Sequence, residues 1–394
     1  MAATQYQHLH FFRKMPNADL ARYFAAQKIT LEVDLTELKE NDSEAILQAF
    51  KTLSESQQAD IEADFQAINA LAFDGGIKAL VDEAVYHDKD DSFAKAIAEM
   101  PCFHSKVMWA FLNKRGYWKG ASRFLHADNV SPFFWKKRIE LPPASPCVED
   151  ADIAQLEKAI SSFFYRKQGK GRNCEVNPLR RYNKEYFFAY PEDFAQSSIE
   201  WISDELKPRA RHPAFEIIFV YCEDENSLDI YAPKNIKEIA DLQKIFARTI
   251  LKLDALPDGE FYKPVYEIDA LEDGKFEFTK PKDSKISNVV VTHLRLTLEE
   301  GKGVKPNRHI MLTANTTKND RAVYDLLDEL TLPAHSITQV GLKVTFYPEG
   351  GQPAKWRKFN VTPPNSCALN YDGNDAVIRE MLALSNIEPS AKAK

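Results

Sequence analysis

Positively charged and aromatic side chains are concentrated in two stretches of the sequence, residues 102–138 and 158–184. Each stretch carries eight Lys or Arg against one Asp or Glu, a formal charge of +7, and the first holds three of the five tryptophans. Cations neutralise phosphates while planar rings stack on unpaired bases, so this combination is typical of surfaces that bind nucleic acid or another polyanion. The candidate binding residues are Lys114, Arg115, Trp118, Lys119, Arg123, Lys136, Lys137, Arg138, Arg166, Lys167, Lys170, Arg172, Arg180 and Arg181.

Three uses of these stretches compete. A chain that folds back at the prolines between them joins both into one basic groove for a polyanion. Aromatic residues such as Trp109, Phe111 and Phe124 instead suit a core with Lys and Arg stems at its rim. Residues 19–99, with 7 basic and 18 acidic residues and a formal charge of −11, can also pair with the basic stretches, within the chain or in a second copy. We favour a protein partner, self-association or use within the chain, nucleic acid or another polyanion second, and a small-molecule or catalytic site third.

Catalytic motifs are missing from the sequence. No glycine fingerprint, phosphate loop, paired-histidine zinc helix or serine elbow is present, so we predict no catalytic residue, no cofactor and no metal ligand. The nearest feature is the basic loop 168–172, with Lys170 and Arg172. It follows the end of a predicted helix, where the helix dipole repels anions, so we expect a mobile, solvated loop.

One enzyme hypothesis stays open as the alternative, a metal-dependent nuclease or hydrolase with carboxylates on the C-terminal sheet. Glu216 and Asp229 fall on the two strands of a predicted hairpin, 215–231, and neighbouring strands bring carboxylates close enough to share an ion. The preferred interpretation is a solvent-facing polar row that alternates with buried Phe215, Ile217 and Phe219.

The elements that position these residues fall into two parts. Residues 1–140 show helical periodicity, including a capping box at Ser54 and Gln57 followed by apolar residues at spacings of three and four. The proline-rich segment 141–150 predicts a linker. Residues 151–394 predict an α+β domain with a mixed or mainly antiparallel sheet, because strand-length aromatic and β-branched runs alternate with helices.

Within the second part, we predict helices at 153–165, 236–253, 321–330 and 375–385. Strands are predicted at 186–190, 289–298, 309–313, 337–347 and 356–361, besides the hairpin. The carboxyl tail, 388–394, is small and polar, so we expect it to fray.

Composition sets the remaining limits. The net charge is −7, no run of eighteen apolar residues occurs, and the five cysteines have no metal-binding spacing. These features predict a soluble, cytoplasmic protein with reduced thiols and no membrane partner. The function that we predict is a non-catalytic recognition or scaffold component that engages a macromolecular partner through its charge-polarised surface.

Overall fold

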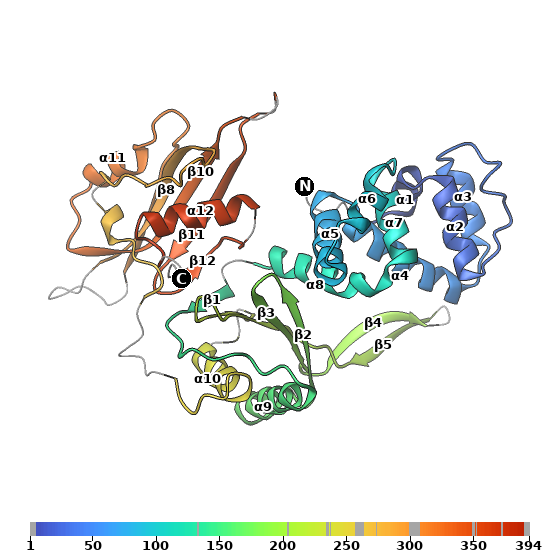
Figure 1. Cartoon of the computed structure of the whole chain (residues 1–394), viewed down its shortest axis with the longest axis horizontal. Helices are drawn as coiled ribbons and strands as arrows, with labels where there is room; N and C mark the ends of the chain where they lie inside the picture. The colour runs from blue at the N-terminus through green and yellow to red at the C-terminus, as the bar shows by residue number, and fades with distance from the viewer. Residues whose placement is uncertain are drawn as a thin grey trace. The chain divides into compact units, whose positions relative to one another are not determined.

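The computed structural model describes residues 5–131, 134–202, 205–233, 236, 238–256, 264–272, 274–298, 308–348, 351, 353–371 and 373–389. The chain forms two compact units, Met1–Val130 and Ser131–Lys394 (Figure 1). The first is helical and the second combines antiparallel sheets with helices, so the predicted order of fold classes is confirmed. No helix among the described residues is long and apolar enough to cross a membrane.

Unit 1 is built from short amphipathic helices around an aromatic core. At the start of α4, Ser54 and Gln57 form the predicted capping box. Phe11 stacks on Phe65 with ring centroids 4.5 Å apart, and both side chains are fully buried. The helices are α1 (His8–Lys14), α2 (Asn17–Gln27), α3 (Ser43–Lys51), α4 (Glu55–Leu71), α5 (Asp74–Asp88), α6 (Ser92–Ala98), α7 (Phe103–Asn113) and α8 (Arg115–Asn129).

The first sheet of unit 2 is antiparallel, with the strand order β1-β7-β6-β3-β2. Its short edge strand pairs with β7, from Trp135 opposite Tyr231 to Arg138 opposite Leu228. This pairing draws residues 135–138 into unit 2, so the units divide before the predicted end of the helical domain at 140. The strands are β1 (Trp135–Arg138), β2 (Cys174–Arg181), β3 (Lys184–Pro191), β6 (Ile217–Cys222) and β7 (Ser227–Tyr231).

The predicted linker, 141–150, lies inside unit 2. Leu141 belongs to the core beneath the first sheet, and the Tyr221 hydroxyl donates a hydrogen bond to the Ala144 carbonyl at 2.6 Å. The proline segment is therefore fixed against the sheet.

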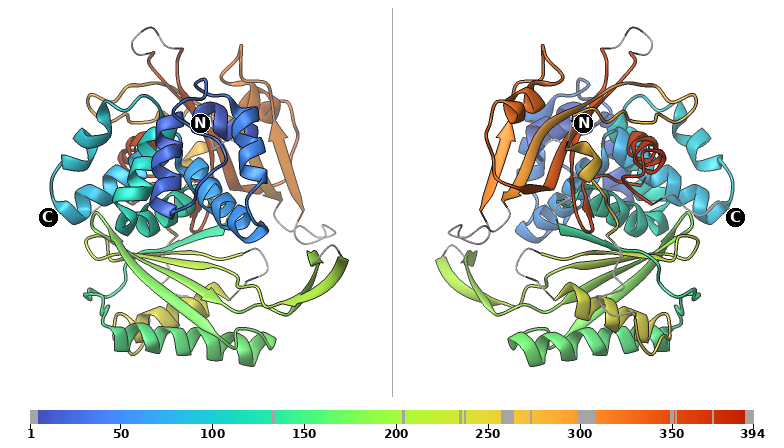
Figure 2. Two further views of the ribbon diagram at one scale, coloured as in Figure 1. Left: turned by 90° about the vertical axis from the view of Figure 1, so that its right-hand side faces the viewer. Right: turned by 90° about the vertical axis from the view of Figure 1, so that its left-hand side faces the viewer.

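Two helices, α9 (Asp150–Gln168) and α10 (Ile239–Thr249), lie side by side on one face of the first sheet (Figures 1 and 2). Phe246 of α10 stacks on Phe219 of β6 at a centroid distance of 5.3 Å. The expected alternation of buried and solvent-facing residues in this hairpin is wrong for β6, because all six of its residues are buried. A central strand covered on both faces has no solvent-facing row.

A separate two-stranded ribbon, β4 (Gln196–Ile202) and β5 (Glu205–Arg211), projects from the first sheet of unit 2 (Figure 1). We call it the arm. Its strands pair antiparallel over their full length, from Gln196 opposite Arg211 to Ile202 opposite Glu205. Neither strand was predicted from the sequence.

The second sheet of unit 2 is also antiparallel, with the order β12-β11-β10-β8-β9. All four strands predicted between residues 289 and 361 are confirmed within it. Its core includes Leu342 and Val344 of β10 and Met381 of α12. The elements are β8 (Ile286–Leu298), β9 (His309–Thr313), β10 (His335–Phe346), β11 (Trp356–Thr362), β12 (Ser366–Cys367), α11 (Ala322–Asp328), α12 (Gly373–Leu384) and a 3-10 turn, η3 (Asp269–Leu271).

Candidate functional site

The predicted binding residues at the start of α8 pair with the acidic part of unit 1. Lys114 lies 3.6 Å from Asp88, and Arg115 lies 3.6 Å from Asp64. The Arg115 guanidinium also lies 3.5 Å from the centre of the Phe111 ring. These contacts pair the basic stretch 102–138 with the acidic residues 19–99 within one chain. Such pairing is the alternative to polyanion binding that the charge pattern left open.

The rest of α8 presents a mixed surface. The Trp118 ring is half-buried, edge-on to Phe111 at 5.1 Å. Lys119 is exposed and Arg123 is half-buried on the same helix.

The three cations of β1 are buried or half-buried in unit 2. Lys137 and Arg138 are buried, with Lys137 2.9 Å from Glu225 and Arg138 donating to the Gln243 side chain at 3.2 Å. Lys136 is half-buried, and burial lowers its pKa. Of the aromatic residues before them, Phe133 lies outside the described residues. Lys137 and Arg138 are thus engaged with protein groups rather than presented to solvent.

The basic loop after α9 is ordered by its own contacts. Lys170 is buried, 3.3 Å from Asp193 and 4.0 Å from the centre of the Phe215 ring. The backbone N–H of Gly171 donates to the Glu192 carbonyl at 2.7 Å. The expectation of a solvated loop is therefore wrong at Lys170, whereas Arg172 is exposed.

The strand β2 carries the last two predicted residues. Arg180 lies 3.3 Å from Glu185 of β3, across the strand pair. Arg181 is buried, with its guanidinium 5.5 Å from the centre of the Tyr182 ring. The predicted basic residues of α8, with Lys114 just before it, therefore belong to unit 1, and the others belong to unit 2.

An exposed basic surface does occur on α9 and α10, and we call it the α9–α10 patch. Arg166 and Lys167 were predicted, whereas Lys244 and Arg248 were missed. These four residues line a depression of about 590 Å³ whose one acidic side chain, Asp241, lies 3.7 Å from Lys167. The spacing of four between residues 244 and 248 is the signal that could have revealed one basic helix face.

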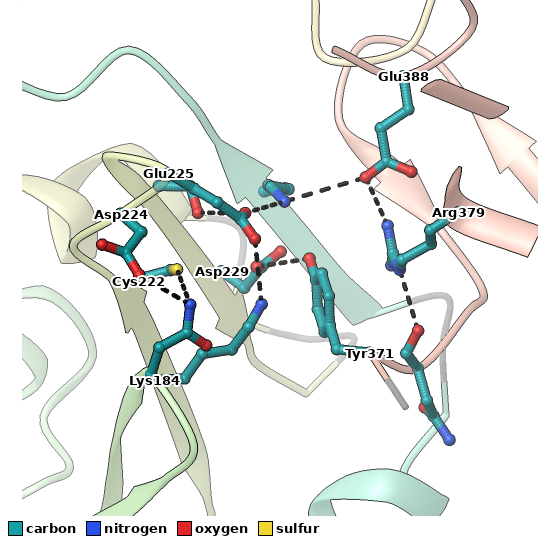
Figure 3. Close-up of polar contacts among 12 residues, drawn as sticks. Lys184, Cys222, Asp224, Glu225, Asp229, Tyr371, Arg379 and Glu388 are labelled. Carbon is teal, nitrogen blue, oxygen red and sulfur yellow. Dashed lines mark hydrogen bonds and ion pairs between the residues drawn. The ribbon is translucent and has the colours of Figure 1, made fainter. Parts of the chain in front are cut away.

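A network of buried and half-buried polar residues, which we call the ionic cluster, links the first sheet of unit 2 to the segment that carries α12 (Figure 3). Glu225 pairs with Lys137 at 2.9 Å and with Lys184 at 3.6 Å. Glu388 accepts a hydrogen bond from Arg379 at 2.6 Å. The members are Lys137, Lys184, Glu225, Asp229, Tyr371, Arg379 and Glu388.

Tyr371 is the centre of this network. Its hydroxyl donates to Asp229 at 2.7 Å, and its ring lies between Lys184 and Arg379, 3.3 and 4.0 Å from their charged groups (Figure 3). Three cations and three carboxylates balance in formal charge, which is the condition under which buried charges are tolerated.

The electrostatics of the cluster follow from burial and pairing. Burial opposes ionisation of Glu225, but Lys137 and Lys184 outweigh it and lower its pKa from 4.5 to about 2. Burial lowers the pKa of Lys184, and the nearby carboxylate of Glu225 only partly offsets this. Burial also favours the neutral form of Lys137, yet Asp229, Glu225 and Glu388 raise its pKa above the ordinary value. Lys137 and Glu225 are therefore a charged pair at neutral pH.

Two cluster members, Glu388 and Asp229, were assigned other environments from the sequence. Glu388 was expected to fray with the carboxyl tail, which is wrong, because its side chain is only 8% exposed and bonded to Arg379; residues 390–394 lie outside the described residues. Asp229 was paired with Glu216 in the hydrolase hypothesis. Asp229 lies opposite Val220 and bonds Tyr371, whereas Glu216 precedes β6. Among the described residues no group of three or more His, Cys, Asp or Glu could hold a metal ion, and the hydrolase stays a hypothesis.

The arm carries the two large hydrophobic residues with the highest exposed fractions among the described residues, Trp201 and Ile199. Trp201 is 74% exposed, Ile199 is 70% exposed and Leu206 is 56% exposed. Because side chains alternate across a strand pair, all three project from one face of the ribbon, together with Pro208, which lies opposite Ile199. The other face carries Glu200, whose carboxylate pairs with arginines of β5.

Comparison of the sequence with models of known protein families and with curated proteins finds no match.

Proposed function

We propose that this protein is a non-catalytic recognition and scaffold component whose arm engages a macromolecular partner, and that this partner is a second copy of the chain. The exposed apolar face of the arm carries the proposal. Isolated two-stranded ribbons are marginally stable in water, and contiguous exposed apolar residues mark contact surfaces.

The two strands of the arm, β4 and β5, differ in whether their free edges can pair with a further strand. β5 contains Lys207, Pro208, Arg209 and Arg211, and lysine and proline are the residues that block strand addition at sheet edges. β4 contains no Lys, Arg or Pro. A partner strand is therefore expected at the edge of β4.

The sequence of β4 suits antiparallel pairing with itself. A twofold axis at Ile199, the middle of the seven-residue strand, pairs β4 over its full length with the β4 of a second copy, and only Ile199 faces its own copy. Trp201 then lies opposite Ser197, a large residue beside a small one. The single charge, Glu200, lies opposite Ser198 rather than its own copy, so no like charges meet. The resulting four-stranded sheet doubles the apolar face.

Sedimentation equilibrium of the full chain tests this proposal. We expect a dimer that the Trp201→Ser variant weakens by about 30-fold in dissociation constant, the effect of removing a tryptophan hot spot of about 2 kcal/mol. The matched control is Trp356→Ser, since Trp356 of β11 is also exposed, at 60%, but lies outside the arm. A monomeric wild type, or equal weakening by both variants, contradicts the proposal.

Polyanion binding is the second candidate function, supported by the α9–α10 patch. Each phosphate that a cation neutralises steepens the salt dependence of binding. We expect Lys167→Glu and Lys244→Glu each to reduce the salt slope for a single-stranded oligonucleotide by about 1. Lys119→Glu in α8 is the control for the alternative surface in unit 1. Unchanged binding in the two patch variants contradicts this use of the patch.

A further inference from the structure

A cavity of about 830 Å³ adjoins the ionic cluster within unit 2. Its walls come from Lys137 and residues 139–143, from the turn at 224–226, from Tyr371, and from α12 with residues 388 and 389. The volume lies within the range of small-molecule sites, which are about 300–1,000 Å³. The cavity is therefore large enough for an organic ligand.

The charge of the lining is strongly asymmetric. Its described residues include five carboxylates, those of Glu140, Asp224, Glu225, Glu380 and Glu388, but only two cations. Both cations are engaged by lining carboxylates, since Lys137 pairs with Glu225 and Arg379 pairs with Glu388. The lining has a formal charge of −3, so its potential favours a positively charged ligand.

One lining residue, Glu388, has a carboxylate oxygen without a hydrogen-bond partner among the described residues. Glu388 is 8% exposed in its side chain, and its Oε1 atom accepts from Arg379 at 2.6 Å and lies 3.9 Å from the Lys137 ammonium. Its Oε2 atom is buried and makes no hydrogen bond within the part of the chain that the structure describes. A buried carboxylate oxygen without a donor is costly, so a ligand N–H that reaches it gains the full hydrogen bond.

The remaining walls are apolar. Leu141, Pro142 and Pro143 line one side, and Ala376, Ala383 and Leu384 of α12 line another. Such walls suit a hydrocarbon body and offer little to the solvation shell of a bare metal ion.

We propose that this cavity is a binding site for an organic ammonium ligand, whose N–H donates to Oε2 of Glu388 and whose apolar body lies against α12. The ligand class follows from the acidic lining, the buried acceptor and the apolar walls together. The site is independent of the arm, and it serves recognition of a small molecule rather than of a second copy.

Calorimetric titration of the full chain with pentylamine, pentanol and pentanoate as probes tests the proposal. These probes have unbranched apolar chains of four or five carbons and differ in charge, so we expect only the amine to bind. Glu388→Gln removes the anionic acceptor and is expected to weaken amine binding by about tenfold. Glu329→Gln is the control, since Glu329 is exposed at the end of α11 and does not line the cavity.

A second variant tests the cavity without changing a carboxylate, and it decides the proposal where Glu388→Gln affects folding. Ala383→Phe adds a ring to the apolar wall while leaving every carboxylate in place, and we expect it to abolish amine binding. No heat with pentylamine, equal binding of pentanoate, or wild-type affinity in both cavity variants would overturn the assignment. The circular dichroism spectrum of each variant establishes that its fold is retained.

Discussion

Glu225 should stabilise unit 2 in a manner that depends on pH. Its pKa is lowered from 4.5 to about 2, because the ammonium groups of Lys137 and Lys184 outweigh the effect of burial. A carboxylate whose pKa is lowered in the folded state contributes its full stability at pH values above its unfolded-state pKa. This contribution is lost as the pH falls to its folded-state pKa. The difference corresponds to about 3 kcal/mol at neutral pH.

Glu225→Gln removes this contribution and leaves Lys137 buried with fewer partners. We expect the variant to be about 3 kcal/mol less stable than the wild type at neutral pH. The gap between the two proteins should narrow as the pH falls from about 4.5 to about 2, where the wild-type carboxylate is protonated as well.

Urea unfolding followed by hydrogen exchange reads this effect locally, because peptides that contain β1 and β7 report on unit 2 alone. Glu329→Gln is the matched control, since this exposed carboxylate has the same chemistry outside the cluster. If Glu225→Gln costs no more than Glu329→Gln at neutral pH, or if its cost is unchanged at about pH 2, the assignment of Glu225 as a half-buried paired anion is refuted.

Two further predictions concern the buried residues Lys170 and Cys367. Lys170→Ala should lower the free energy of unfolding by about 3 kcal/mol in urea, because it leaves Asp193 without its buried partner. Arg172→Ala in the same loop should change the free energy of unfolding by no more than about 0.5 kcal/mol. Equal effects of the two variants would contradict the ion pair. Burial raises the pKa of the Cys367 thiol to about 12, so iodoacetamide at neutral pH should alkylate it about a thousandfold more slowly than an ordinary thiol. Mass spectrometry of the alkylated peptides measures this rate against half-buried Cys147, and comparable rates would contradict it.

The sequence predicted the periodic elements well, because helical stripes and β-branched runs record burial directly. The capping box at Ser54 and the strands of the second sheet are examples. The arm and β1 escaped prediction for a physical reason. β1 is four residues long and three of them are cations, while β5 interleaves four charges with a proline, so neither shows the apolar alternation of a buried strand.

The ionic cluster was beyond prediction from sequence. Its members come from β1, β3, the β6–β7 hairpin and the segment around α12, and Lys137 and Glu225 are separated by 88 residues. Each residue looks like an ordinary surface charge until tertiary packing removes it from water. Lys137 is an example. Its charge suggested a phosphate contact in the sequence, but in the structure its side chain is buried and pairs with Glu225.

Cross-linking through β4 tests the proposed self-association most directly. In the twofold pairing, residue 199 lies opposite its own copy, whereas residue 196 lies opposite residue 202. The account predicts that an Ile199→Cys variant, treated with a short bismaleimide, yields a covalent dimer joined at position 199, and that Gln196→Cys yields far less. A chain that stays monomeric with Ile199→Cys, or that cross-links equally at both positions, would contradict the assembly of two copies through the arm.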